Sequence, residues 1–162
     1  MSFFKEVKEW ALNELETEGK LLPMLFAQSF DKNEVFQFPL TGEKEVDRDK
    51  LILEIREVFH GLDIQEFVMA FESVVRHPSS KEGIEALGLM YVVYEEDRRI
   101  LKKHAFFKIK RKGRRVILKE IKDIELMESP FIEILPETYQ KPSESQKQLA
   151  LSKLKRFSTP MN

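Results

Sequence analysis

The side chains best able to do chemistry in this sequence are basic, and they gather in residues 98–122. This segment carries twelve Lys and Arg and one acid, so its net charge is +11. The whole chain carries 27 basic and 28 acidic residues, which leaves −12 for the remainder. Lys and Arg at this density attract phosphate and carboxylate groups regardless of sequence. The charge separation therefore predicts an anionic partner or association between copies of the chain.

The pattern of the basic segment predicts a β-hairpin. Apolar and basic residues alternate over 99–110, Lys112-Gly113 is a two-residue turn signal, and 114–121 is predicted as the returning strand. The apolar residues of the first strand are expected on one face, and its basic residues, with His104 and Phe106, on the other. The predicted anion-binding residues of the hairpin 98–115 are Arg98, Arg99, Lys102, Lys103, His104, Phe106, Lys108, Lys110, Arg111, Lys112, Arg114 and Arg115.

Two members of this set have specific predicted roles. If it is exposed, Phe106 could stack on a base, and His104 could touch a phosphate or be an ordinary solvated strand residue. A two-stranded ribbon also fits the major groove of DNA. A purely structural explanation is that Lys and Arg protect an edge strand from aggregation, although a charge of +11 exceeds what this protection needs.

These observations lead to three hypotheses for function. The first is a non-enzymatic binding module whose hairpin contacts an anionic partner, either nucleic acid or an acidic protein face. The second is a self-associating structural or accessory protein, a homo-oligomer in which the hairpin meets an acidic face of the next copy. A phage or bacterial inhibitor acting by surface complementarity would have the same features. The third and least favoured is a metal-dependent enzyme that processes a phosphorylated small molecule.

Signals for catalysis, a metal or a cofactor are weak. The chain has no Cys, and its six Gly form no phosphate-binding loop. His60, His77 and His104 are not spaced as metal ligands; His60 is expected at a helix end and His77 at the surface. Glu72 interrupts an apolar strand, so it marks a site, lies near the strand end, or pairs with a Lys of the next strand. We expect no catalytic residue, no metal and no cofactor.

The rest of the sequence predicts the scaffold. Helical periodicity predicts one helix over 2–18, capped by Ser2 and ended by Gly19, and a second helix capped by Asp47 and ended by Gly61. Strands are expected over 20–29, 35–38, 65–76 and 86–95, and a short helix over 143–157.

This order of elements predicts an α+β fold. We expect a largely antiparallel five- to six-stranded sheet with two helices packed on one face and a C-terminal tail or helix. The predicted α+β domain covers residues 1–128. Residues 129–162 are predicted to form a Pro-interrupted tail with a short basic amphipathic helix.

Several short segments of the chain are similar, in their order, to segments of other proteins. They are Gly19-Lys20-Leu21-Leu22-Pro23, the strand FVMAFESVV at 67–75, Pro78, and Glu85-Ala86-Leu87. In their order the chain resembles a loose group of uncharacterised small α+β proteins of bacteria and their phages, over residues 1–122. The resemblance implies the fold and carries no activity with it.

The sequence also predicts where the protein acts. Its N-terminus has early acids and no apolar signal region, and no stretch approaches the roughly 20 apolar residues that cross a bilayer. We therefore expect a soluble cytoplasmic protein without a membrane partner.

Overall fold

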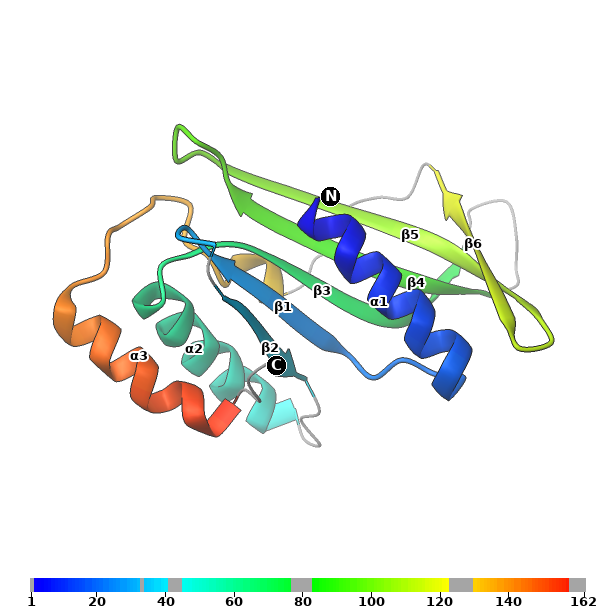
Figure 1. The fold of residues 1–162 in the computed structure, drawn as a ribbon, viewed down its shortest axis with the longest axis horizontal. Coiled ribbons are helices and arrows are strands. Elements are labelled where there is room, and N and C mark those ends of the chain that lie inside the picture. The colour runs from blue at the N-terminus through cyan, green and yellow to red at the C-terminus, as the bar shows by residue number, and fades with distance from the viewer. Residues whose placement is uncertain (1, 33, 41–44, 77–82, 123–129, 158–162) are drawn as a thin grey trace.

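The computed structural model describes residues 2–32, 34–40, 45–76, 83–122 and 130–157. Six strands form one antiparallel sheet in the order β2-β1-β3-β4-β5-β6 (Figure 1). The strands are β1 (Met24–Ser29), β2 (Val35–Pro39), β3 (Ile64–Arg76), β4 (Gly83–Tyr94), β5 (Ile100–Lys112) and β6 (Arg115–Ile121). The helices are α1 (Phe3–Glu18), α2 (Glu45–Gly61), α3 (Glu144–Phe157) and the 3-10 helix η1 (Pro130–Glu133). The predicted α+β class with an antiparallel sheet is confirmed.

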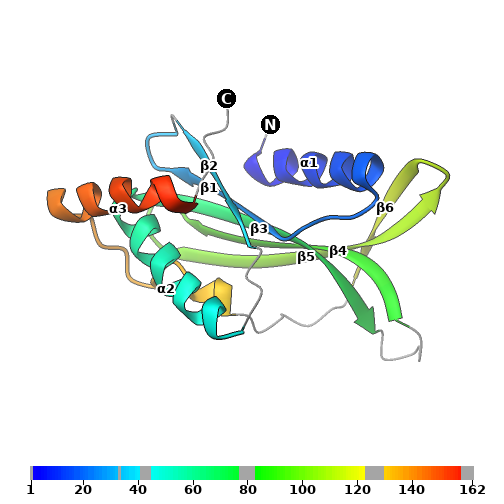
Figure 2. The same ribbon diagram turned by 90° about the horizontal axis from the view of Figure 1, so that it is seen from below.

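The two long helices lie on opposite faces of the sheet (Figure 2). Helix α1 buries Val7 and Leu15 in a cluster with Val68 of β3. Helix α2 buries Ile55 in a separate cluster with Phe67 of the same strand. The predicted packing of both helices on one face is therefore wrong. Because β3 and β4 are apolar on both faces, each face must be covered by its own layer.

The ends of α1 match their sequence signals, whereas the start of α2 does not. The Ser2 hydroxyl accepts a hydrogen bond from the Lys5 N–H at 3.3 Å, and Gly19 has φ 77° and donates to the Leu15 carbonyl. Helix α2 begins at Glu45, so Asp47 lies inside the helix and is not its cap. The helix extends further toward the N-terminus than the capping signal predicted, and it ends at Gly61 as expected.

The chain after residue 129 packs against α2. Ile132 and Ile134, in and just after η1, are buried in the α2 cluster. The predicted helix at 143–157 is observed as α3, which lies beside α2 with Ala150 buried (Figure 1). The division of the chain into a 1–128 domain and a 129–162 tail stays a prediction, because its boundary falls outside the described residues.

Gly61 permits the close approach of α2 and α3. A Cβ atom added at Gly61 would overlap Ala150 Cβ and the carbonyl oxygen of Gln146. The neighbouring His60 Nε2 lies 3.1 Å from Gln146 Oε1, and the Lys153 ammonium pairs with Glu57. Small residues at the crossing therefore set the distance between the two helices.

We expect Gly61→Ala to destabilise the protein by about 1–3 kcal/mol and to loosen α3, because the added methyl group overpacks the crossing. Urea unfolding measures the first effect, and limited proteolysis within 144–157 measures the second. Gly19→Ala is the matched control: its Cβ meets nothing within 4 Å but it strains a residue with φ 77°. It should lower stability without exposing α3. Equal protection of α3 in wild type and Gly61→Ala would contradict this account.

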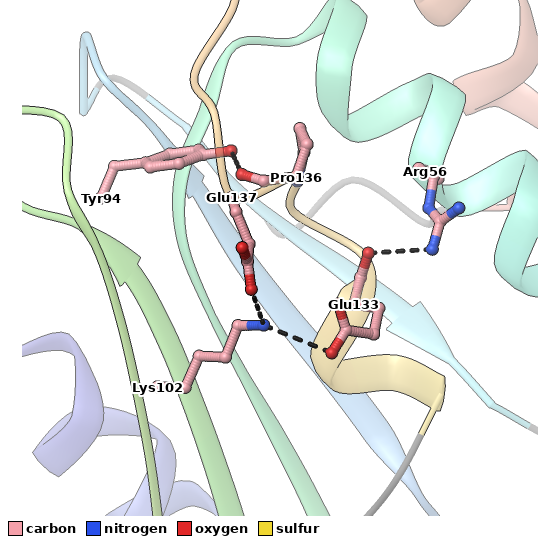
Figure 3. Close-up of polar contacts among 6 residues, drawn as sticks. All are labelled: Arg56, Tyr94, Lys102, Glu133, Pro136 and Glu137. Atoms are coloured by element: carbon pink, nitrogen blue, oxygen red, sulfur yellow. Dashed lines mark hydrogen bonds and ion pairs between the residues drawn. The ribbon is translucent and has the colours of Figure 1, made fainter.

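All three tyrosines of the chain donate a partly buried hydrogen bond. Tyr91 donates to Glu66 at 2.7 Å, Tyr139 donates to Asp63 at 2.7 Å, and Tyr94 donates to the Pro136 carbonyl (Figure 3). Burial is the largest cause that raises each pKa: that of Tyr94 to about 12 and that of Tyr139 to about 12. The pKa of Tyr91 is raised further, by burial and then by Glu66.

We expect no tyrosine of the folded protein to titrate at its ordinary pKa of 10.0. Since folding raises these pKa values, their stabilising effect is complete below pH 10 and is lost as the pH rises to about 12. An absorbance titration of tyrosinate in buffer and in denaturant tests this. A phenol that ionises equally in both conditions would contradict it.

Candidate anion-binding face

The register of β5 and β6 places most of the hairpin's charge on one side. Ile109 pairs with Leu118 and Arg111 with Val116, and these residues face α1. The alternate pairs, Lys108–Lys119, Lys110–Ile117 and Lys112–Arg115, face the other way. We call these last six residues the basic face.

Two of the three pairs on the basic face place like charges directly opposite each other. Lys108 faces Lys119 and Lys112 faces Arg115, and all five cations of the face are exposed. Among the described residues, none of these cations forms an ion pair. Like charges opposed across a strand pair are destabilising. An anion lying over the face would remove that repulsion.

The strands under the basic face supply no acid among the residues that the structure describes. The single acid of the basic segment, Glu120, pairs with Phe107 and therefore lies on the α1 side. Glu85 is also on the α1 side, where its carboxylate binds Arg111 at 2.8 Å. The residues of β3 and β4 that share the side of the basic face are apolar or neutral, among them Phe71, Ser73 and Ala86.

Helix α1 packs against the side of the hairpin opposite the basic face. Ile109 and Val116 are buried in the α1 cluster, and Leu118 packs against it. The Glu16 carboxylate of α1 accepts the backbone N–H of Val116 at 3.1 Å, on the edge strand of the sheet. The hairpin is therefore fixed on one side, and its basic face is presented on the other.

Several residues of the predicted set lie away from this face. Arg98 and Arg99 sit in the turn before β5, roughly 45 Å along the strand from the hairpin tip at about 3.4 Å per residue. The Arg98 guanidinium stacks 4.0 Å from the Phe30 ring centroid, and Arg99 pairs with Asp97 at 2.6 Å. The backbone and then the side chain of Arg99 lower the pKa of Asp97. Both Arg residues thus have partners within the protein.

The remaining predicted anion-binding residues also lie outside the basic face, at different places on β5 and in the turn. Lys102, 18 % exposed, pairs with Glu133 at 3.4 Å and Glu137 at 4.0 Å beneath η1 (Figure 3). Lys103 is exposed on the α1 side of β5, opposite Tyr91, and Arg114 is exposed in the turn.

Phe106 is not available for base stacking. It is 2 % exposed and packs edge-on against Phe71, with ring centroids 6.1 Å apart, and against His104 at 5.5 Å. The half-buried His104 leaves its Nδ1 without a hydrogen-bond partner among the described residues. His104 and Phe106 lie on the same side of β5 as Lys108 and Lys110, but farther from the hairpin turn.

Sequence reasoning missed two members of the face, Lys119 and Ile117. The predicted two-residue turn at Lys112-Gly113 is wrong by one residue: Lys112 pairs with Arg115, so the turn is Gly113-Arg114, and this register brings Lys119 opposite Lys108 in place of Ile117. Ile117 is 46 % exposed and is the apolar member of the face.

The other candidate residues have structural partners. Glu72 accepts the backbone N–H of Leu21 and so ties the segment before β1 to β3. His60 ends α2 beside Gln146, and His77 lies outside the described residues. Within the described ranges, no three His, Asp or Glu side chains gather as a metal site requires.

A cavity of about 260 Å³ lies beside α1, lined by Trp10, Glu14, Glu18, Lys20, Leu22 and Met24.

Comparisons with known proteins add no relationship. No protein-family model, curated protein or solved structure matches the chain significantly. None of the helices that the structure describes has the length and apolar character needed to cross a bilayer.

We expect Lys119→Glu to raise stability by about 0.2–1 kcal/mol, because it turns a repulsive cross-strand pair with Lys108 into an attractive one. Lys119→Gln should give a smaller gain, and Lys141→Glu, at an exposed position outside the helices and strands, should change little. Urea unfolding at low salt measures these differences. A loss of stability in Lys119→Glu would contradict the opposed pair.

Proposed function

We propose that the protein is a non-enzymatic binding module whose basic face holds a polyanion, the phosphate backbone of nucleic acid in preference to an acidic protein. One observation carries the proposal: five exposed cations, two pairs of them directly opposed, share a strand face without an acid among the described residues. Such a face is destabilising in the free protein and becomes favourable only when negative charge covers it.

The composition of the face favours nucleic acid over protein. Four of its five cations are Lys, a residue that is depleted at protein–protein interfaces. Aromatic side chains, which are enriched at such interfaces, are absent from its six residues. Lys on a flexible stem suits the phosphate backbone, where each contact is electrostatic and independent of sequence.

The acidic remainder of the chain does not prevent this binding. Screening at physiological salt acts over about 8 Å, so charges beyond that distance contribute little repulsion. The nearest described acids of the sheet, Glu85 and Glu120, lie on the α1 side of the strands. The cations of the basic face are thus separated from the acids of the neighbouring strands, which is the arrangement that a polyanion site needs.

Self-association is the second candidate function. The cavity beside Trp10 is lined by Glu14, Glu18 and Lys20 as well as apolar side chains, so its net charge of −1 is opposite in sign to the basic face of another copy. Light scattering at about 50 and 500 mM salt separates the two functions, since screening differs several-fold between them. A mass above the monomer that falls with salt supports self-association.

A metal-dependent phosphate-processing enzyme has less support. Its candidate carboxylate, Glu72, is occupied by the backbone N–H of Leu21. An inhibitor that acts by surface complementarity, and a cytoplasmic location, stay predictions from the sequence.

We expect the protein to bind a nucleic acid with an affinity that falls steeply with salt. At about −0.9 per phosphate contacted, five cations give a slope of roughly −4 to −5 for log affinity against log salt on a duplex. Reversing Lys108, Lys110 and Lys119 to Glu should lower affinity at least about 100-fold and reduce the slope to about −2. Fluorescence anisotropy with a labelled oligonucleotide measures both.

The control reverses Lys5, Lys50 and Lys141, which are exposed on other elements, and changes the net charge equally. It should retain affinity within a few-fold. If both triple variants lost affinity equally, binding would follow net charge and not the basic face. If neither lost affinity, the proposed site would be wrong. Circular dichroism checks that both remain folded.

A further inference from the structure

The tip of the β5–β6 hairpin extends beyond the backbone pairing of β5 with β4, to which the Arg111–Glu85 ion pair still joins it. The pairing of β4 with β5 ends at Ala86–Lys108, whereas β5 and β6 stay paired to Lys112–Arg115. Residues 109–118 are therefore a two-stranded ribbon at one end of the molecule (Figure 1). Helix α1 backs one side of it through Ile109 and Val116.

The pairs of the basic face have a regular spacing along this ribbon. Lys110–Ile117 is the central pair, with Lys108–Lys119 on one side and Lys112–Arg115 on the other. The two flanking pairs are four residues apart, or about 14 Å at about 3.4 Å per residue. This is close to the width of the DNA major groove, about 12 Å.

We propose that the ribbon lies in the major groove of duplex DNA. The flanking pairs reach the phosphates on the two sides of the groove, and Lys110 and Ile117 lie over the base edges. Lys donates to guanine O6 and N7, and an apolar side chain contacts the thymine methyl group. This inference rests on the proposed function and adds which nucleic acid is bound and how.

The same features disfavour other nucleic acids. A single strand is held by aromatic side chains that stack on unpaired bases, but Phe106, the aromatic residue on this side of β5, is buried. Duplex RNA has a deep, narrow major groove that side chains cannot enter. The ribbon therefore predicts a preference for B-form DNA, beyond the general attraction of its charge.

The test compares the full-length protein on duplex DNA, duplex RNA of the same sequence, single-stranded DNA and polyglutamate by fluorescence anisotropy. We expect duplex DNA to bind at least about tenfold more tightly than duplex RNA. Methyl green, a major-groove ligand, should displace the protein, and netropsin, a minor-groove ligand, should not.

Two matched variants test the face that enters the groove. Lys110→Glu and Lys103→Glu change the same charge on the same strand, but on opposite sides of it. We expect at least about a tenfold loss of DNA affinity for Lys110→Glu and under about threefold for Lys103→Glu. Lys110→Gln is a milder second variant and should lose affinity in the same direction.

The outcomes separate this inference from the proposed function. Absence of binding to every polyanion overturns both. Equal binding to DNA and RNA, tighter binding to single strands, or displacement by netropsin alone contradicts binding in the major groove. Each of these results leaves the proposed polyanion site intact. Tighter binding to polyglutamate overturns the groove and indicates an acidic protein partner.

Discussion

The structure depends on the burial of β3 and β4 on both faces. Val68 and Leu89 point toward α1, and Phe67 and Met90 point toward α2, all of them almost completely buried. Apolar side chains of this size contribute about 1.5–3 kcal/mol each when buried. Neither helix could leave its face without exposing a row of such residues. The two-sided core therefore requires the three-layer arrangement, with one helix on each face.

This arrangement also explains why the charge can be placed on one side of the hairpin. Helix α1 extends over β6 and covers one side of the β5–β6 pair, where Ile109 and Val116 are buried. Helix α2 and η1 cover the other face of the sheet only toward the opposite end, near Lys102 (Figure 2). The second side of the hairpin is left uncovered by the described elements, and its outward positions carry cations.

The energetic balance permits an arrangement that opposes like charges. Each opposed pair costs of the order of 0.2–1 kcal/mol, since both side chains are exposed and screened by water. Burial of the apolar residues on the reverse side contributes more than this, at roughly 1.5–3 kcal/mol for each large side chain. The fold can therefore hold Lys108 against Lys119 without a compensating acid. The pair itself does not stabilise the fold, because its like charges repel.

The sequence by itself determined the local features of this protein. Alternation placed Phe107 and Lys108 on opposite sides of β5, the glycine at 113 marked the hairpin turn to within one residue, and Ser2 and Gly19 marked the ends of α1. These features depend on the period of a strand or on a hydrogen bond between near neighbours, so they can be inferred from adjacent residues.

Only the tertiary structure decided which sides were covered. It placed the helices on opposite faces, buried Phe106 against Phe71, and moved Arg98 onto Phe30 at the far end of β5. It also gave Glu72 a backbone partner, Leu21, from 51 positions away in the chain. These contacts join segments that are distant in sequence, and local periodicity contains no information about which distant segment covers a given face.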